Sequence, residues 1–323
     1  MINYDVFNGD ADGIISLLQL RLAYPADHVL VTGVKRDIEL LKQVPSDDAN
    51  NVVVLDISME KNVIPLQRLL DNGVSVFYAD HHRSGDIPKS DNLDAKIDLD
   101  ANICTALIID QFLDGAFHLW AITAAYGDNL IVKADGLSLA AGLTKKQSEQ
   151  LKQLGTLINY NGYGSSVVDL HFHPAELFKS LLKYPCPFDL FDDKSSPYWV
   201  LHNAYEADMS QALAVTPRHQ SKILALFELP DLPWARRVSG VYGNYLANQT
   251  PATANGVLTS NADGTFTLSL RAPLNNKQGA GDICSQFATG GGRAAAAGIN
   301  ALPVEHVDDF ISVTESYYSG STH

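Results

Sequence analysis

Aspartate and histidine side chains that can hold metal ions occur in four short motifs near the start of the chain. They are Asp10 and Asp12, Asp56, the triplet Asp80-His81-His82, and Asp128. Carboxylate oxygens and imidazole nitrogens are ligands that hard and borderline divalent cations prefer. Two such cations, about 3.5–4 Å apart, can hold the attacking and leaving oxygens of a phosphoryl displacement. The motifs therefore predict a metal site at which an activated water attacks a phosphate.

The histidine pair favours a metal site over the simpler interpretation that the aspartates only cap helices. An aspartate at the end of a strand is often a helix N-cap, and Asp12 can cap the helix that it precedes. Independent caps do not explain why His81 and His82 also stand at the end of an apolar run. At that place His82 can bind a phosphate oxygen or protonate a leaving group near neutral pH.

Apolar runs alternate with helical periodicities through the first part of the chain, which indicates βαβ units and a parallel sheet. Strands are predicted over residues 2–8, 28–33, 51–56 and 74–79, and helices over 14–24, 37–44 and 63–70. In an open α/β sheet, ligands bind beyond the carboxyl ends of the strands. Three of the acidic motifs follow predicted strands, so we expect them to converge at one edge of the sheet.

The remaining chain changes character twice. Helices are predicted over residues 101–113, 117–126, 143–158, 175–182 and 221–227, a loop over 184–197 and a linker at 230–233. Strands over 258–260 and 265–271 flank a turn, and a short helix is expected over 283–288. In the glycine-rich run 290–298, close backbone approach and a following helix N-terminus would favour a phosphate.

These patterns predict an α/β protein in three parts. The first is a parallel-sheet domain with helices on both faces, over residues 1–140. A mostly helical connector follows over 141–235, and a smaller α+β domain covers 236–323.

The charge of the chain argues against long nucleic acids as ligands. The formal net charge is −14, and residues 1–140 alone hold 10 Lys and Arg against 21 Asp and Glu, a net of −11. Binding along an extended phosphate backbone requires an excess of basic residues. The acidic charge lies with the predicted metal site, where bound cations would offset part of it.

The first residues and the cysteines predict a cytoplasmic protein. The start of the chain lacks the basic and apolar regions of a signal peptide, and no apolar run approaches the ~18 residues of a membrane span. Cys104, Cys186 and Cys284 are odd in number and widely spaced, which is typical of a reducing compartment.

The order and spacing of the motifs resemble those of the DHH phosphoesterase superfamily. The matching residues are Asp10-Ala11-Asp12-Gly13, Asp56, Asp80-His81-His82 and Asp128. Residues 290–298 resemble the glycine-rich motif of the associated DHHA1 domain, and Ser269-Leu270-Arg271 resembles the strand before it. The resemblance implies hydrolysis of phosphodiesters or phosphoanhydrides with two divalent cations, Mn²⁺ before Mg²⁺. It also implies substrate capture by the second domain.

The resemblance further implies roles for individual residues. The ligands would be Asp10 and Asp56 for one cation, and Asp12, Asp56, His81 and Asp128 for the other. The catalytic residues would be His82, which would face the scissile phosphate, and Asp80, which would orient a ligand. The substrate-binding residues would be Arg271, Gly291, Gly292 and Arg293.

The sequence departs from the family pattern at two places. Many relatives have a histidine just before the first aspartate pair, whereas residues 6–8 of this chain are Val, Phe and Asn. We therefore expect Asn8 to contribute an oxygen to the metal site, or a water to take that place. Many relatives also have a histidine after the three glycines, where this chain has Arg293. Its forked guanidinium suits a terminal phosphate or a guanine edge.

The sequence favours a hydrolase of short linear nucleotides, such as the dinucleotide pGpG or RNA of a few residues (nanoRNA), which it would cut to mononucleotides. An acidic first domain would repel an extended phosphate backbone except at the metals. Three alternatives stay open. They are a processive single-strand exonuclease, a phosphatase of 3′-phosphorylated adenosine nucleotides, and a catalytically silent nucleotide-binding module. We expect a short nucleotide as partner and no membrane, and a homodimer is left open.

Overall fold

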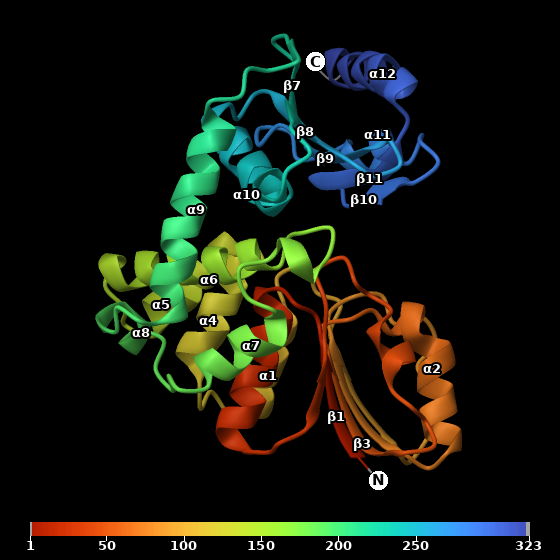
Figure 1. Ribbon diagram of the computed structural model, residues 1–323, viewed down its shortest axis with the longest axis vertical. Coiled ribbons are helices and arrows are strands. Elements are labelled where there is room, and N and C mark those ends of the chain that lie inside the picture. The colour runs from red at the N-terminus through yellow and green to blue at the C-terminus, as the bar shows by residue number, and fades with distance from the viewer. Residues whose placement is uncertain (1, 321–323) are drawn as a thin grey trace. The chain divides into compact units, whose positions relative to one another are not determined.

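The computed structural model describes residues 2–320 and divides the chain into two compact units (Figure 1). The first unit is Met1–Ala204 and the second is Tyr205–His323. The division falls inside one helix, α9 (Pro197–Leu213). In this division, residues 141–204 fall in the first unit and residues 205–235 in the second. No helix in the described part of the chain is long and apolar enough to cross a membrane.

Five parallel strands form the sheet of the first unit, where the sequence predicts a parallel sheet of four. They are β1 (Ile2–Phe7), β2 (Val29–Val31), β3 (Ala49–Leu55), β4 (Ser75–Asp80) and β5 (Leu93–Ile97). Their order in the sheet is β2-β1-β3-β4-β5, and all neighbouring pairs are parallel. The sequence does not predict β5, which is a partly exposed edge strand with polar residues among its apolar ones.

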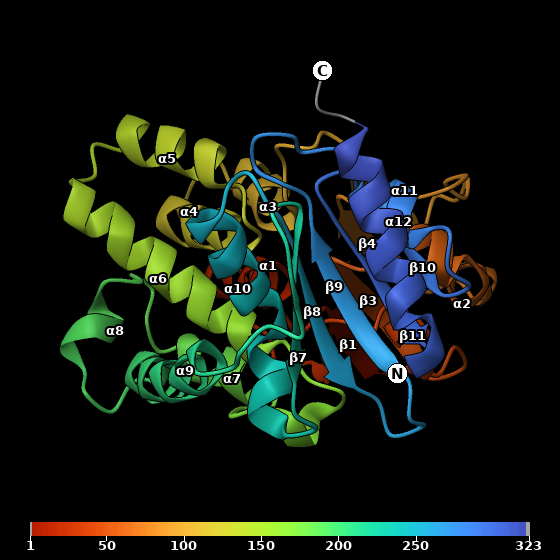
Figure 2. The same ribbon diagram turned by 90° about the horizontal axis from the view of Figure 1, so that it is seen from above.

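Helices cover both faces of this sheet. They are α1 (Ala11–Ala23), α2 (Met59–Asp71), α3 (Thr105–Phe112), α4 (His118–Gly127), α5 (Ile131–Ala140), α6 (Lys145–Asn161), α7 (Pro174–Leu181), α8 (Asp189–Asp192) and the start of α9. Helix α2 lies on one face, and α1, α4 and α6 lie on the other (Figures 1 and 2). The helix predicted over 37–44 is wrong, because this segment forms only a 3₁₀ turn at Leu40–Gln43.

Two glycines let α4 and α6 pack closely beside the start of α1. A Cβ atom at Gly155 in α6 would lie 2.1 Å from the carbonyl oxygen of Thr123 in α4. A Cβ atom at Gly127 would lie 2.5 Å from the Cβ of Ala11, the first residue of α1. Side chains are thus excluded at both places. The close contact fixes α4 and α6 against the segment that carries the first aspartate pair.

The second unit is built on a mixed six-stranded sheet. Its strands are β6 (His219–Gln220), β7 (Leu224–Leu229), β8 (Ala254–Ser260), β9 (Phe266–Arg271), β10 (Gly290–Gly292) and β11 (Ala296–Leu302). They run in the order β10-β11-β9-β8-β7-β6. Its helices are α10 (Pro233–Gln249), α11 (Ala280–Cys284) and α12 (Val307–Ser319). Figure 2 shows α10 on one face of this sheet and α11 and α12 on the other. The predicted linker at 230–233 lies inside this unit, between β7 and α10.

Two segments of the second unit are strands where the sequence predicts helical structure. The segment 221–227 leads into β7, which pairs with β6 and β8. The glycine run forms β10, and the alanines after it begin β11, with Gly291 opposite Gly298. A Cβ atom at Gly290 would lie 1.8 Å from the carbonyl oxygen of Cys284, so this glycine allows a close approach of two backbones. The expected helix N-terminus for a phosphate is therefore wrong.

Candidate metal centre and active site

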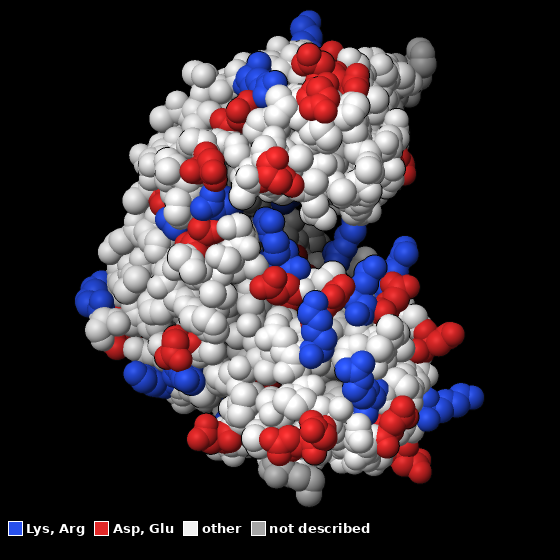
Figure 3. Space-filling model, turned by 45° about the vertical axis from the view of Figure 1, so that its right-hand side comes forward, with Lys and Arg blue, Asp and Glu red and all other residues white. Residues whose placement is uncertain are grey.

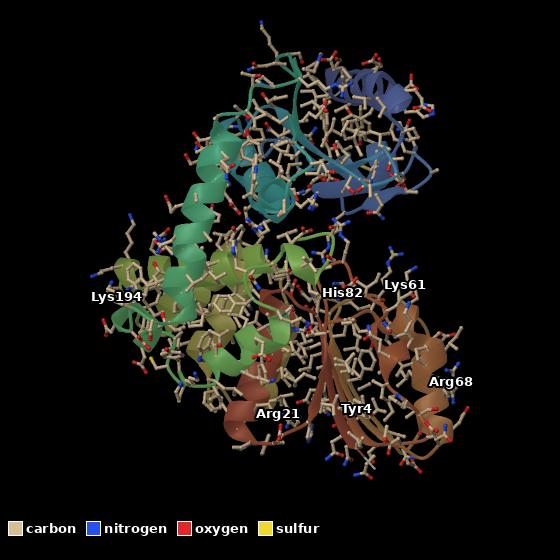
Figure 4. All side chains as sticks on the ribbon, viewed as in Figure 1. Tyr4, Arg21, Lys61, Arg68, His82 and Lys194 are labelled. Carbon is tan, nitrogen blue, oxygen red and sulfur yellow. The ribbon has the colours of Figure 1, made fainter. Side chains whose placement is uncertain are left out.

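Three neighbouring strands of the first unit bring the predicted residues to one edge of the sheet. Asp10 lies just beyond β1, Asp56 follows β3 directly, and Asp80 is the last residue of β4. Because β1, β3 and β4 are adjacent and parallel, their carboxyl ends meet at the same edge. Figure 4 shows His82 at this end of the strands, whereas Tyr4 lies toward the other end. The convergence predicted from the apolar runs is confirmed.

The carboxylate of Asp12 is held at the N-terminus of α3. Its two oxygens accept hydrogen bonds from the backbone N–H groups of Thr105 and Ala106, both at 2.7 Å. The first N–H groups of a helix have no partner within the helix, and its N-terminus favours negative charge. This contact fixes the orientation of the buried carboxylate. The sequence contains no recognisable signal for it, because the donors are backbone groups distant along the chain.

The ring of His81 is oriented so that one nitrogen faces the carboxylates. Its Nδ1 lies 2.8 Å from the carbonyl oxygen of Ile103, and a carbonyl can only accept, so Nδ1 carries the proton. Its Nε2 lies 3.5 Å from Asp56 Oδ1 and 3.8 Å from Asp12 Oδ2. These separations are long for hydrogen bonds. They suit ligands that share one cation, because each ligand atom lies about 2.0–2.6 Å from a hard cation.

Asp56 occupies a strained and crowded position. Its backbone φ is 58°, a left-handed conformation that non-glycine residues rarely adopt. Thr105 Oγ1 donates a hydrogen bond to its Oδ1 at 3.1 Å. Burial and the charges of Asp12 and Asp10 raise the pKa of Asp56 well above its ordinary value. A cation among these carboxylates would relieve that repulsion and keep Asp56 ionised.

Asp128 adds a further acidic group from the C-terminal end of α4. Its Oδ2 is buried and has no hydrogen-bond partner among the described residues. Burial raises the pKa of Asp128 above its ordinary value; the Lys35 ammonium opposes this rise, and the charge of Asp12 adds to it. A buried oxygen without a partner is costly unless something binds it. The oxygen and nitrogen donors of Asp12, Asp56, His81 and Asp128 therefore fit a divalent cation of the Mn²⁺ or Mg²⁺ type.

His82 stands beside this set and is more exposed. Its Nδ1 lies 2.7 Å from Asp80 Oδ1, and its side chain is 38% exposed, whereas that of Asp80 is fully buried. Burial alone would lower the pKa of His82, but the hydrogen bond to Asp80 and the nearby acidic charges raise it above its ordinary value. Ligand atoms of Asp56, His81 and His82 also lie within 4.8 Å of one another. The geometry therefore allows His82 to act either as a proton donor or as a metal ligand.

Asp10 and Asn8 have contacts that the sequence did not lead us to expect. Asp10 caps α1, and its Oδ1 accepts from the backbone N–H groups of Asp12 and Gly13, each at 3.1 Å. Its Oδ2 accepts a hydrogen bond from the ammonium of Lys35. Burial would raise the pKa of Asp10, but Lys35 outweighs it and the pKa falls to about 2. Asn8 Oδ1 accepts from Asp10 N at 3.1 Å, so its amide holds this loop in place.

Lys35 is the site residue that sequence reasoning missed. It follows β2, the neighbour of β1, in the sequence Gly33-Val34-Lys35, and its Nζ also donates to Asn159 Oδ1 at 3.2 Å. A lysine just beyond the carboxyl end of a strand next to β1 was a signal that could have been used. Asn159 lies just beyond the helix predicted over 143–158, and no signal in the sequence pointed to it.

The predicted substrate-binding residues lie in the second unit. Arg271 on β9 donates hydrogen bonds to Asn244 Oδ1 at 2.7 Å and to Ser269 Oγ at 2.9 Å. Arg293 is exposed in the turn between β10 and β11, and its backbone N–H bonds to Ala296 O at 2.9 Å. A Cβ atom at Gly291 would meet open space, whereas at Gly292 it would lie 2.5 Å from Ala297 Cα. The two units are not placed relative to each other, so the substrate roles stay predictions.

No family model and no curated protein matches the sequence. Solved structures do match its fold. An exonuclease RecJ bound to manganese has a TM-score of 0.56 and 17% identity, over 98% of this chain and 90% of that one. The pGpG-specific phosphodiesterase PggH from Vibrio cholerae has a TM-score of 0.56 and 12% identity, over 99% of both chains. RecJ from Thermus thermophilus with Mn²⁺ has a TM-score of 0.55 and 16% identity, over 98% of this chain and 52% of that one.

These likenesses define the fold. The chain shares its α/β fold with these RecJ and PggH structures. The fold class predicted from the sequence is confirmed. At sequence identities of 12–17%, these comparisons show a shared fold and do not identify the substrate or the number of bound metal ions.

Proposed function

We propose that the protein is a metal-dependent phosphodiesterase that hydrolyses short linear nucleotides, such as the dinucleotide pGpG, to mononucleotides. The observation that carries this proposal is the set of four donors at the carboxyl edge of the sheet, with His82 beside them. The donors are Asp12, Asp56, His81 and Asp128. Structures of the same fold include a manganese-bound exonuclease and a pGpG-specific phosphodiesterase, which supports the same reaction class here.

A divalent cation held by these donors would supply a positive charge beside the phosphate and lower the pKa of a bound water. The protein itself fixes the orientation of the ligands. The α3 N-terminus orients Asp12, and the Ile103 carbonyl orients His81. Such outer contacts fix the ligands in the geometry that the cation requires.

The Asp80–His82 pair supplies the proton in this proposal. Hydrolysis of a phosphodiester forms a bond from water oxygen to phosphorus and breaks the bond to the leaving oxygen, which needs a proton. His82 carries one at neutral pH to a greater extent than an ordinary histidine, because Asp80 raises its pKa against the effect of burial. Its Nδ1 is engaged with Asp80, so its Nε2 is the atom that would donate to the leaving oxygen.

Charge supports a short substrate over a long one. The net charge of residues 1–140 is −11. Figure 3 shows acidic and basic side chains mixed over the visible face of the first unit, in the lower part of the view. The net negative charge of residues 1–140, rather than this mixed face, would repel a long single strand outside the metal site. A single-strand exonuclease is the second candidate, and the fold shared with RecJ favours it.

Hydrolysis assays can separate the two candidates. The full chain would be incubated with Mn²⁺ and either 5′-phosphorylated dinucleotides of each base or a single strand of about 20 nucleotides, longer than the roughly 4–16 nucleotides that one basic groove covers. We expect rapid loss of the dinucleotide, with the long strand intact. Degradation of the long strand would favour the exonuclease, and cleavage of neither would contradict both. An Asp56→Asn variant provides the matched inactive control, because it keeps the shape of the side chain and loses its charge.

A further inference from the structure

Lys35 is fixed on both sides of its backbone beside the candidate metal centre. Its N–H donates to the carbonyl oxygen of Gly162 at 2.8 Å. Its own carbonyl accepts from Asn8 Nδ2 at 3.1 Å. Asn8 also receives the backbone N–H of Asp10, so one amide side chain links the two segments. Hydrogen bonds to the backbone of Lys35 and of Asp10 therefore hold these two residues at a fixed position relative to each other.

Three groups of the protein contact the ammonium of Lys35. Its Nζ donates to Asp10 Oδ2 and to Asn159 Oδ1, the latter at 3.2 Å. The ring centroid of Tyr163 lies 5.7 Å from Nζ, within the range of a cation–π contact. The side chain is 30% exposed, while that of Asp10 is 5% exposed. A carboxylate, an amide oxygen and an aromatic ring thus surround one positive charge.

Both oxygens of Asp10 accept hydrogen bonds, as those of Asp12 do, but one donor to Asp10 is a charged ammonium, whereas the donors to Asp12 are neutral backbone N–H groups. Its Oδ1 accepts from two backbone N–H groups at the start of α1, and its Oδ2 accepts from Lys35. The resemblance to the DHH superfamily implies Asp10 and Asp56 as ligands of one of two cations. The charge that Asp10 would receive from that cation is already supplied by an ammonium on the same chain.

Two of the other predicted ligands, Asp128 and His81, still have a ligand atom without a hydrogen-bond partner in the described part of the chain. The buried Oδ2 of Asp128 has no hydrogen-bond partner among the described residues. His81 Nε2 faces the Asp12 and Asp56 carboxylates at distances too long for hydrogen bonds. A cation would supply the missing partner of Asp128 and His81, whereas Asp10 already has a positively charged partner in Lys35. The sequence departs from the two-metal pattern at the same place, because it has no histidine before Asp10.

From these contacts we propose that the Lys35 ammonium takes the place of one of the two cations, so that the centre binds a single divalent cation. Its ligands are Asp12, Asp56, His81 and Asp128. Lys35 supplies the second positive charge from the protein itself, on the Asp10 side of the site. This inference rests on the proposed function, in which a phosphate binds at the centre. A fixed ammonium beside the cation would then bind a phosphate oxygen as a point charge.

The number of bound ions tests the inference without any turnover. The full chain, stripped with a chelator, would be titrated with Mn²⁺, and the bound metal counted by mass spectrometry and by electron paramagnetic resonance. We expect one Mn²⁺ per chain with the spectrum of an isolated ion. In Lys35→Ala and Lys35→Met we expect a second Mn²⁺ per chain and the spectrum of an exchange-coupled pair. Lys35→Arg keeps the charge and should stay at one.

Arg36→Ala is the matched control, because it removes an exposed cation from the neighbouring position and should leave the count at one. Circular dichroism of each variant would confirm that it is folded. Two coupled ions in the unaltered chain would overturn the inference, and so would a count of one in both folded variants that lack the charge. The count also separates this inference from the proposed function. One ion per chain without dinucleotide hydrolysis would contradict only the function, and two ions with hydrolysis would contradict only the inference.

Discussion

His82 donates a hydrogen bond from Nδ1 to Oδ1 of the fully buried Asp80 at 2.7 Å. The second oxygen of Asp80 is buried without a hydrogen-bond partner among the described residues, so its charge is directed mainly at this histidine. The contact fixes the ring and leaves Nε2 available. The two residues thus form a carboxylate–imidazole pair at the end of β4, next to the candidate metal centre.

His82 should act as the proton donor of the reaction. In His82→Ala, we expect turnover of a dinucleotide to fall by ~10²-fold or more, the scale of lost acid–base catalysis. Mn²⁺ binding, measured by calorimetry, should remain within a few-fold of the unaltered protein. A matching loss of Mn²⁺ affinity would instead make His82 a metal ligand, which the 4.8 Å cluster with Asp56 and His81 also allows.

Asp80 should act through His82, as a positioning residue. In Asp80→Asn the acceptor for Nδ1 remains but the negative charge is lost, so the pKa of His82 should fall. A proton donor with a lower pKa loses its proton at lower pH, so the basic limb of the kcat profile should shift to lower pH. Loss of such an outer partner typically costs about 10- to 100-fold in activity. An unchanged profile with reduced activity would show that Asp80 has only a structural role.

Asp128 should matter for metal affinity more than for stability. Its buried Oδ2 gains a partner only when a cation binds. We expect Asp128→Asn to weaken Mn²⁺ binding by at least the about 10-fold that loss of an outer partner costs. The metal-free variant should unfold at the same or a higher temperature, because an uncompensated buried charge is removed. Unaltered Mn²⁺ affinity would remove Asp128 from the ligand set.

The parts of the fold that position the site could be predicted because their signals are local. The runs before Asp56 and Asp80 are apolar and short, and a helical periodicity follows Asp56. The edge strand β5 and the small-residue strands β10 and β11 were missed because pairing with a neighbour creates them. Gly291 and Ala297 have little preference for a strand, and only hydrogen bonding to β11 and β9 places them in one.

The site also combines features with local sequence signals and features that depend on contacts between distant segments. The residue types of the metal set could be predicted from the motifs. The contact of Lys35 with Asp10 could not, because it depends on the order of β1 and β2 in the sheet. The backbone donors to Asp12 come from the start of α3, which is far along the chain. Long-range contacts of this kind leave no periodicity in the sequence.

The close packing of α4 and α6 gives a stability prediction with an internal control. In Gly155→Ala the new methyl group would lie 2.1 Å from Thr123 O, so we expect a loss of about 1–3 kcal/mol or more in the free energy of unfolding. In Gly136→Ala, in α5, the methyl group meets open space and should stabilise the protein by about 0.4–1 kcal/mol. Urea unfolding of both full-length variants measures the difference. Equal changes in the free energy of unfolding for the two variants would show that α4 and α6 can move apart to accept the methyl group without loss of stability.

The three cysteines should differ in their reactivity toward a thiol reagent. Cys104 and Cys284 are fully buried, whereas Cys186 is partly exposed. Burial raises the pKa of Cys104 well above its ordinary value, with the charges of Asp12 and Asp128 adding to it, and burial raises the pKa of Cys284 to about 12. Since the thiolate is the reactive form and an ordinary thiol has a pKa of about 8.5, a change from pH 7 to 9 should not activate either buried thiol.

We therefore expect one thiol per native chain to react rapidly with a chromogenic disulfide at both pH values, and all three to react in denaturant. Cys186→Ser should abolish the rapid phase, while Cys284→Ser should leave it unchanged. If the rapid phase includes Cys104, the segment before α3 opens in solution. The N–H groups that orient Asp12 would then be held less firmly than their 2.7 Å contacts indicate.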